Sequence, residues 1–290
     1  MSPLALVLWS ALFHATWNLL IKRHPDPNAG MTAVAGISGL FGLAFTVAEL
    51  ARGGAAPFPD RWALALAIFC GLSESVYFLS LGRALRDASL GLSYVVVRGG
   101  GVLLVWPLAY AVHHEVPTPL QAGAVTLMLC GLALLVPPGA AARSRAGYGW
   151  AMLAALCVGI NHVAYKAALN AGGRPWAVFG IAMLVATPAT VFGMGEALAA
   201  GLSGSQLART AGAWRRAPWL LISAGVLSGV SFGLSLHAMQ TAGAAWVGTL
   251  RNTSVALAPL LGWGFLGERP GPRARVGFVA VAVAVVLLAR

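Results

Sequence analysis

Apolar runs of about twenty residues follow one another through almost the whole chain, the length that crosses a bilayer as a helix. Only 9% of the 290 residues are charged, whereas 59% are hydrophobic. A soluble domain carries roughly 25% charged residues, and one with so few would expose large apolar patches and aggregate. The runs are too long and alternate too little for barrel strands. The chain is therefore predicted to be an all-α, polytopic membrane protein.

Composition excludes several other classes. Intrinsic disorder requires low hydrophobicity and high charge, the reverse of what is found here. The net charge of +11 does not indicate nucleic acid, because most basic residues flank apolar runs and are expected to contact membrane lipid headgroups. The three cysteines lie inside apolar runs at unrelated spacings, so neither a disulfide set nor a metal site is expected.

Charges, prolines and glycines divide the apolar sequence into ten transmembrane helices. The expected spans are 3–22, 31–50, 62–83, 89–112, 119–137, 147–168, 175–198, 217–240, 243–266 and 273–289. Connections long enough to be linkers are expected only at 51–61, 138–146 and 199–216. The first apolar run lacks a basic leading region and a cleavage site, so it is predicted to be a span and not a signal peptide.

The two halves of the chain carry matching residues. An arginine in the fourth span and a Glu-x-Pro-x-Pro sequence after it recur 153 residues later. The chain has 17 arginines and only two lysines, and these lysines are also a matched pair, 144 residues apart. The matched residues are Arg98 with Arg251, Glu115 with Glu268, and Lys22 with Lys166.

A duplication explains this pattern. Five spans make an odd number of crossings, so two consecutive copies enter the membrane from opposite sides. Residues 1–137 and 147–290 are therefore predicted to be inverted five-helix repeats joined by a linker at 138–146. Inverted repeats are typical of secondary transporters that bind substrate near the middle of the membrane.

The arrangement resembles a known family. Two halves of five spans, the Trp17-Asn18…Lys22 end of the first span, and Glu115 and Glu268 before the fifth and tenth spans are similar to EamA-type transporters of the drug/metabolite transporter superfamily. The resemblance covers nearly the whole chain. It implies a secondary carrier of small metabolites, often an exporter, in the bacterial inner membrane, and it names no substrate. Arginines in the middle of the fourth and ninth spans depart from the general family pattern.

These arginines, Arg98 and Arg251, are the first candidates for substrate binding. Each lies about nine residues into its span, close to the middle of a roughly 30 Å hydrocarbon core. A charge at that depth costs several kcal/mol unless it faces a cavity or a partner. Two guanidinium groups suit a carboxylate, phosphonate or phosphate, which they bind bidentately. The alternative is a structural arginine bonded to carbonyl groups or paired with Glu74.

Glu74 is the one acid deep inside a span, with Tyr77 a turn further on the same helix face. Burial favours the neutral form of a carboxyl group and nearby cations favour the charged form. Glu74 is therefore a candidate proton-coupling residue, or else it forms a static salt bridge to an arginine.

Further polar and aromatic residues fall at helical spacing around these charges. A polar stripe on a spanning helix is expected to face a cavity. His14 is a second candidate for proton coupling, although a lone histidine is also common as a hydrogen-bonded core residue. The other residues expected to contact or wall in the substrate are Trp17, Asn18, Tyr77, Tyr94, Asn161, His162, Trp246 and Asn252.

The repeated lysines and glutamates are assigned to gating or structure. Lys22 and Lys166 either line the cavity or extend from helix ends to the headgroups. Glu115 and Glu268 lie just before Pro-initiated helices, outside the hydrocarbon core. The Gly225-x-x-x-Gly229-x-x-x-Gly233 stripe is predicted to allow close helix packing.

No catalytic, nucleotide-binding or metal-binding motif is present in the sequence, so no cofactor, no metal and no enzymatic activity are expected. The predicted function is secondary transport of a small anionic or zwitterionic metabolite, driven by protons or a counter-solute. The alternative is a flippase for a phosphate-bearing lipid intermediate, which would use the same arginines. The oligomeric state is open between monomer and homodimer.

Two arguments about orientation disagree. Ten crossings put both termini on one side, where five Lys and Arg residues fall, against twelve on the other side. The positive-inside rule then places the termini outside, whereas the family resemblance implies termini in the cytoplasm. Both orientations remain open.

Overall fold

The computed structural model describes residues 1–87, 90–135, 145–193, 205–257 and 271–290, and in these ranges it contains helices and no strand. The helices of the first half are α1 (Pro3–Lys22), α2 (Pro27–Ala51), α3 (Arg61–Asp87), α4 (Leu90–His113) and α5 (Pro119–Leu134). Those of the second half are α6 (Arg145–Asn170), α7 (Pro175–Pro188), the π-helical turn η1 (Ala189–Gly193), α9 (Gln206–Arg216), α10 (Pro218–Thr241), α11 (Ala244–Arg251) and α13 (Pro272–Leu288).

Proline sets the start of many of these helices. α1, α2, α5, α7, α10 and α13 each begin at a proline. The fixed φ angle of proline fits the first helical turn, where its missing N–H group would have had no partner. The side chains of Ser2, Asp26 and Thr118 accept backbone N–H groups at 3.3, 3.1 and 3.2 Å and cap the helices that follow.

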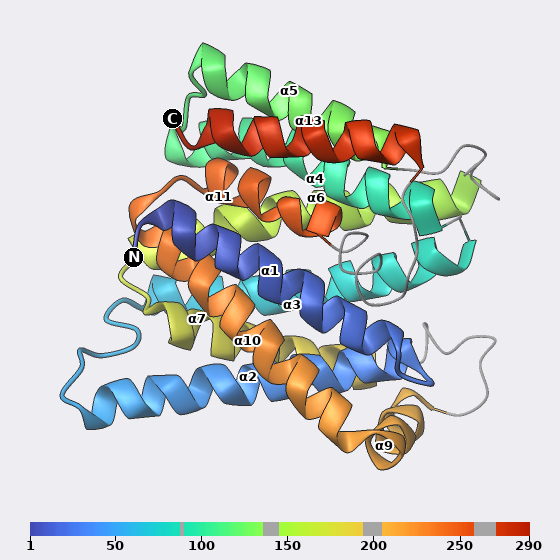
Figure 1. The fold of residues 1–290 in the computed structure, drawn as a ribbon. Helices are drawn as coiled ribbons and strands as arrows, with labels where there is room; N and C mark the ends of the chain where they lie inside the picture. Colours follow the sequence, from blue (N-terminus) through green and yellow to red (C-terminus); the bar gives the residue numbers. More distant parts are fainter. Residues whose placement is uncertain (88–89, 136–144, 194–204, 258–270) are drawn as a thin grey trace.

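The expected spans coincide with helices that begin within four residues of the predicted starts. Six of them, α1, α2, α3, α4, α6 and α10, are long and apolar enough to cross a membrane, and α5 and residues Pro175–Val191 are shorter apolar helices. The chain is thus a multi-pass membrane protein, and the count of ten spans stays a prediction. Both termini lie at the same end of the helix bundle (Figure 1).

The predicted linker at 199–216 is wrong in its second part, because residues Gln206–Arg216 form helix α9. The apolar residues of α9 recur on one face of the helix and never form a continuous run, so a search for spans missed it. The seventh expected span is described only to residue 193, and the linker at 138–146 lies almost wholly outside the described residues.

Helices of the two halves pack in matching pairs. α1 packs along α10 as α3 packs along α6, and α2 packs on α10 as α3 packs on α7. The pairs α2 with α7 and α5 with α13 each join counterparts, and α5 and α13 lie side by side at one face of the bundle (Figure 1). If each helix is replaced by its counterpart in the other half, the same set of these packed pairs results. These pairs are what two structurally similar halves would form, and the inverted repeat stays a prediction.

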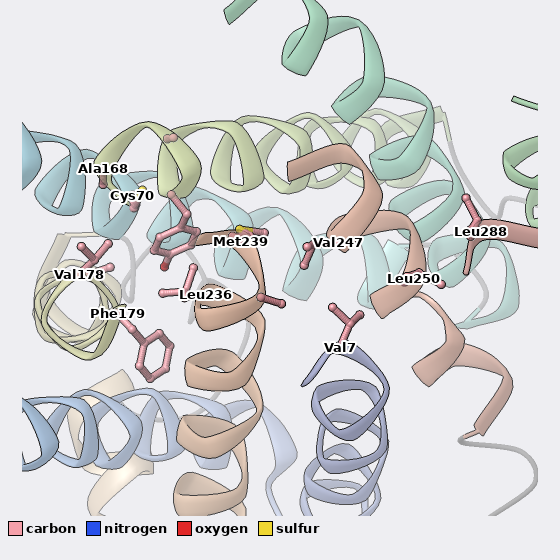
Figure 2. Packing of buried hydrophobic residues seen from close by; sticks show 14 of the residues in the cluster. Val7, Cys70, Ala168, Val178, Phe179, Leu236, Met239, Val247, Leu250 and Leu288 are labelled. Atoms are coloured by element: carbon pink, nitrogen blue, oxygen red, sulfur yellow. The ribbon is translucent and has the colours of Figure 1, made fainter. Parts of the chain in front are cut away.

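The core between the halves is held by apolar side chains and close helix contacts. Val7 of α1, Leu236 and Met239 of α10, and Val247 and Leu250 of α11 belong to one buried cluster (Figure 2). Ser10 of α1 and Ser231 of α10 donate hydrogen bonds to each other's carbonyl groups, at 2.7 and 2.8 Å.

The predicted close packing of the glycine stripe on α10 is confirmed. A Cβ atom added at Gly225, Gly229 or Gly233 would overlap the side chains of Ile37, Phe41 or Trp176, which belong to α2 and α7. The absence of a side chain at these positions lets the three helices approach.

Candidate functional site

Arginines from the two halves meet at a single histidine in the middle of the bundle. Nη2 of Arg98, on α4, lies 2.6 Å from Nε2 of His14, on α1. Nη2 of Arg251, in the last turn of α11, lies 3.3 Å from Nδ1 of the same ring. The two arginines, which are 84 and 237 positions from His14 in the sequence, thus contact the same imidazole ring. The sequence predicted that both arginines line one site, and neither guanidinium group has a carbonyl partner among the contacts of the described residues.

This arrangement supplies more hydrogen-bond donors than His14 can accept. The indole N–H of Trp17 also points at Nδ1, at 3.3 Å. A neutral imidazole has one acceptor nitrogen, because the other carries the proton, and a protonated ring has none. Two guanidinium groups and an indole therefore compete for one lone pair. At this ring the donors outnumber the acceptors, and an anion would supply the missing acceptors.

Arg251 is almost enclosed by protein. Arg251 is 5% exposed, and its guanidinium carbon lies 3.7 Å from the centre of the Phe232 ring. Phe232 in turn stacks on Phe179 of α7, with ring centres 5.1 Å apart. Nε of Arg251 is buried and has no hydrogen-bond partner. A cation–π contact thus orients the group, and one of its donors remains unused.

Glu74, on α3, is the buried acid of this cluster. It is 5% exposed, and it interacts electrostatically with Arg251, Arg98 and Tyr165. Neither arginine forms a salt bridge with Glu74 in the described part of the chain, where the ion pairs are Arg174 with Glu49 and Arg209 with Asp26. The static salt bridge considered from the sequence is therefore not formed, and the carboxyl group faces the cluster without neutralising either arginine directly.

Helix α6 contributes polar atoms that have no partner. Nδ1 of His162 lies 2.8 Å from the carbonyl oxygen of Val158, so Nδ1 carries the proton and Nε2 is an acceptor. That Nε2 atom and Oδ1 of Asn161 are buried without a hydrogen-bond partner, whereas the buried hydroxyl group of Tyr165 interacts with Glu74. His162 and Tyr165 interact electrostatically with Arg251. Unpaired buried polar atoms are rare in folded proteins, and this group suits a polar solute or water.

The helix that carries Arg251 is interrupted directly after it. α11 ends at Arg251, Asn252 forms a turn, and helical residues resume at 253. Asn252 donates its side-chain amide to the Gly248 carbonyl at 3.3 Å, whereas the buried hydroxyl group of Ser254 has no partner. Interrupted helices at the centre of a bundle are typical of transporter binding sites. The expected ninth span is therefore divided directly after Arg251.

Other residues predicted to contact substrate are placed differently. The Asn18 amide donates to the carbonyl of His14 at 2.7 Å, one turn back on its own helix. The Trp246 indole donates to the Leu288 carbonyl at 2.8 Å, at the end of α13, so this N–H is not available to a ligand. Tyr77 is half-buried and interacts electrostatically with Arg251. The side chain of Tyr94 lies outside the described residues.

The gating or structural candidates Glu115 and Lys166 both bind the connection between α10 and α11. The carboxylate of Glu115 accepts the backbone N–H groups of Ala244 and Ala245, at 2.7 and 3.1 Å, at the start of α11. Nζ of Lys166 donates to the carbonyls of Met239 and Ala242, at 2.6 and 3.1 Å, at the end of α10. Each charge complements a helix dipole. The Lys22 side chain and Glu268 lie outside the described residues.

Phe232 was not found from the sequence. It carries no polar group, and its neighbours on α10 are Ser231 and small residues, so no chemical pattern marks it. The sequence did contain an indication for Tyr165, because this residue lies three positions after His162 and so on the same face of α6. No group of three or more His, Cys, Asp or Glu side chains within the described ranges could hold a metal ion.

Comparison with known proteins gives a family match and similar solved structures. A model of the EamA-like transporter family matches residues 145–290, the second half of the chain. A solved crystal structure of another protein is similar with a TM-score of 0.71 and 17% identity, over 98% of this chain and 95% of that protein. At this identity the likeness shows the fold alone. No curated protein sequence matches the chain.

Proposed function

This protein belongs to the EamA-like transporter family, and from that premise we propose that it is a secondary active transporter of a small organic anion or zwitterion. Members of the family transport small molecules across membranes, and this chain is a multi-pass membrane protein. In the proposal, Arg98 and Arg251 bind the anionic group of the substrate at the centre of the bundle, and protons drive transport. We place the protein in the bacterial inner membrane, with export as the direction.

The excess of donors at His14 carries this proposal. Two guanidinium groups and one indole point at an imidazole that accepts only one hydrogen bond. A carboxylate or phosphonate offers several lone pairs in one plane, and it would accept from both guanidinium groups at once. Because one arginine comes from each half of the chain, such a ligand would join the halves.

The charge of the cluster favours a substrate with one net negative charge at this point. With both imidazole rings neutral, Arg98 and Arg251 carry two positive charges and Glu74 carries at most one negative charge. The unpaired acceptors on Asn161 and His162 would bind N–H or O–H donors elsewhere on the substrate. An amino acid or a hydroxy acid has both kinds of group.

Proton coupling is assigned to Glu74, because it shares the two arginines with the substrate. A charged Glu74 competes with the substrate anion for the guanidinium groups, and protonation removes this competition. Proton binding and substrate binding would then support each other, and loss of the proton would favour release. The other titratable groups that face Glu74 or the arginines are His14, His162, Tyr77, Tyr165, Cys70 and Cys157.

Alternating access would occur by movement of one half against the other around this cluster. The matched packing of α1 on α10 and α3 on α6 gives both halves the same type of interface. Inverted-repeat transporters open to alternate sides by this kind of rocking.

A thermal-shift screen of the purified protein tests the proposal. The compounds are acetate, lactate, glutamate, methylphosphonate and phosphate, with choline and spermidine as cations. We expect at least one anion to raise the melting temperature and neither cation to do so. Arg52→Ala, which removes an exposed arginine at the end of α2, is expected to keep the response.

Stabilisation by the cations alone would contradict the anion site. Stabilisation by a polyprenyl phosphate, with no response to any water-soluble anion, would instead support the flippase that the sequence left as an alternative.

A further inference from the structure

Helix α9 lies at the end of the bundle opposite the two termini (Figure 1). It has 11 residues, Gln206–Arg216, and is capped by the Ser205 hydroxyl group, which accepts the Ala208 N–H at 3.3 Å. At 1.5 Å per residue, a helix of this length spans about 16 Å, only half of the hydrocarbon core. Two residues after it ends, Pro218 begins the membrane span of α10. α9 is therefore located at the boundary of the membrane.

One face of α9 is fixed to the connection between α1 and α2. The guanidinium group of Arg209 donates to both carboxylate oxygens of Asp26, at 2.8 to 3.1 Å. The ring of His24, which is 3% exposed, places Nε2 at 3.1 Å from the carbonyl oxygen of Ala213. Ala213 belongs to the same buried cluster as Trp17 of α1. These contacts determine which face of the helix points outward.

The outward face is apolar. Leu207 and Trp214, seven positions apart and so on the same side of the helix, are 54% and 43% exposed. Ala211, between them on this face, is also exposed. Trp219, at the start of α10, is 78% exposed. Tryptophan is enriched where membrane proteins meet the headgroup region, and the described part of the protein leaves 43% to 78% of Leu207, Trp214 and Trp219 exposed.

Positive charges lie close to this apolar face, with Arg215 next to it and Arg216 on the side of the helix that carries Arg209. Arg215 and Arg216 are exposed in the last turn of α9, and Arg23 is exposed next to His24, which contacts the same helix. Asp26 is the acid of this region, and it is already engaged by Arg209. Within the described residues, Arg23, Arg215 and Arg216 form no salt bridge.

We propose that α9 and the adjoining Arg23 form a binding site for an anionic phospholipid. Arg215 and Arg216 bind the phosphate group, and Leu207, Trp214 and Trp219 lie against the upper part of the acyl chains. The combination of exposed arginines with an exposed apolar face is what a lipid matches and a soluble phosphate compound does not, because the latter has nothing to cover the leucine and tryptophans. This site is separate from the arginine cluster, and it does not depend on the proposed transport.

Native mass spectrometry of the delipidated protein in detergent tests this site. The protein is titrated with phosphatidylglycerol and, separately, with phosphatidylcholine, which has the same acyl chains and no net charge. We expect wild-type protein to bind phosphatidylglycerol at least about tenfold more tightly, from the attraction of arginines near an anionic headgroup. Arg215→Gln/Arg216→Gln is expected to reduce this preference to about twofold or less, whereas Leu207→Ser/Trp214→Ser weakens both lipids.

The matched control is Arg52→Gln/Arg61→Gln, which also removes two exposed arginines, at the ends of α2 and α3. This control is expected to keep the wild-type preference. Glycerol 3-phosphate, added in excess, is expected to leave the bound lipid in place.

Three results would overturn the proposal. One is an unchanged preference for phosphatidylglycerol in Arg215→Gln/Arg216→Gln. Another is an equal loss in the control variant, which would indicate a general effect of net charge. The third is displacement by glycerol 3-phosphate, which would indicate a site for soluble phosphates. Circular dichroism of each variant checks that the helices are intact.

Discussion

Arg98 and Arg251 hold matching positions in the two halves of the chain, yet their surroundings differ. Arg98 lies in the interior of the continuous helix α4 and is only half-buried, with His14 as its hydrogen-bond partner. Arg251 lies at the end of the interrupted helix α11, is 5% exposed, and is oriented by Phe232. The arginine of the second half is therefore buried and held in one orientation, whereas the arginine of the first half is more accessible.

This difference teaches that a repeated residue need not have a repeated role. Gly99, Gly100 and Gly101 follow Arg98, and Asn252, Thr253 and Ser254 follow Arg251. On α4, Gly100 and Gly101 allow close packing on Ala155 and Val158 of α6 and add no polar side chain after the arginine. On α11, the polar residues form the turn that ends the helix. We infer that Arg251 is already in place before substrate binds, and that Arg98 adjusts to it.

The largest effect is expected for Arg251→Ala. It removes the oriented, buried guanidinium group, and truncation of a buried charge that pairs with an anion typically costs about 2–5 kcal/mol. We expect the affinity for the stabilising anion to fall at least about a hundredfold, measured by isothermal titration calorimetry. Arg251→Lys keeps the charge without the planar fork and is expected to recover only part of the affinity. Unchanged binding by Arg251→Ala would rule out contact with the anion.

Arg98→Ala is expected to have the second largest effect, with a loss of about ten- to thirtyfold, because a more exposed charge contributes less. Its melting temperature without ligand should stay near that of wild type, whereas that of Arg251→Ala should change. This contrast sharpens the comparison. If both variants lost the same affinity and the same stability, the two arginines would be equivalent after all.

Glu74→Gln is expected to remove the pH dependence of anion binding. In wild-type protein, protonation of Glu74 should free the arginines, so the affinity should rise as the pH falls and decrease as the pH rises. The glutamine variant mimics the protonated form and should bind at every pH while losing proton-driven uptake in proteoliposomes. His14→Gln is the control for titration of the imidazole. A variant Glu74→Gln that still accumulates substrate against a gradient would exclude this residue from coupling.

The smallest effect on binding is expected for Trp246→Phe. Its indole N–H bonds to the Leu288 carbonyl, so the change should reduce the free energy of unfolding by about 1 kcal/mol. The anion affinity should stay within about twofold of wild type. A loss of tenfold or more would return Trp246 to the binding site, as the sequence first suggested.

Much of the fold followed from the sequence because membrane helices have strong signals. Long apolar runs, prolines at helix starts and residues repeated at a fixed spacing predicted the helices to within a few positions. α9 was missed because its 11 residues are fewer than a span needs and its apolar residues form no continuous run.

The sequence showed which charged residues belong to the candidate site, and it did not show which side chains they contact. The cost of burying Arg98, Arg251 and Glu74 marked them in the sequence. The role of Phe232 could not be found, because a phenylalanine in an apolar helix is ordinary until an arginine lies on its ring. The place of Trp246, one turn before Arg251, suggested a pocket wall, which stays a prediction, and the sequence did not show that its N–H bonds to the end of α13.

A double-mutant cycle on Arg98 and Arg251 is the most direct test of whether one anion is shared by both arginines. The affinity for the most stabilising anion is measured for wild-type protein, each alanine variant and the double variant. If one anion accepts hydrogen bonds from both groups, the two losses should be strongly coupled, and the double variant should bind hardly more weakly than Arg251→Ala. Losses that simply add, or an affinity that none of the variants changes, would contradict a shared anion.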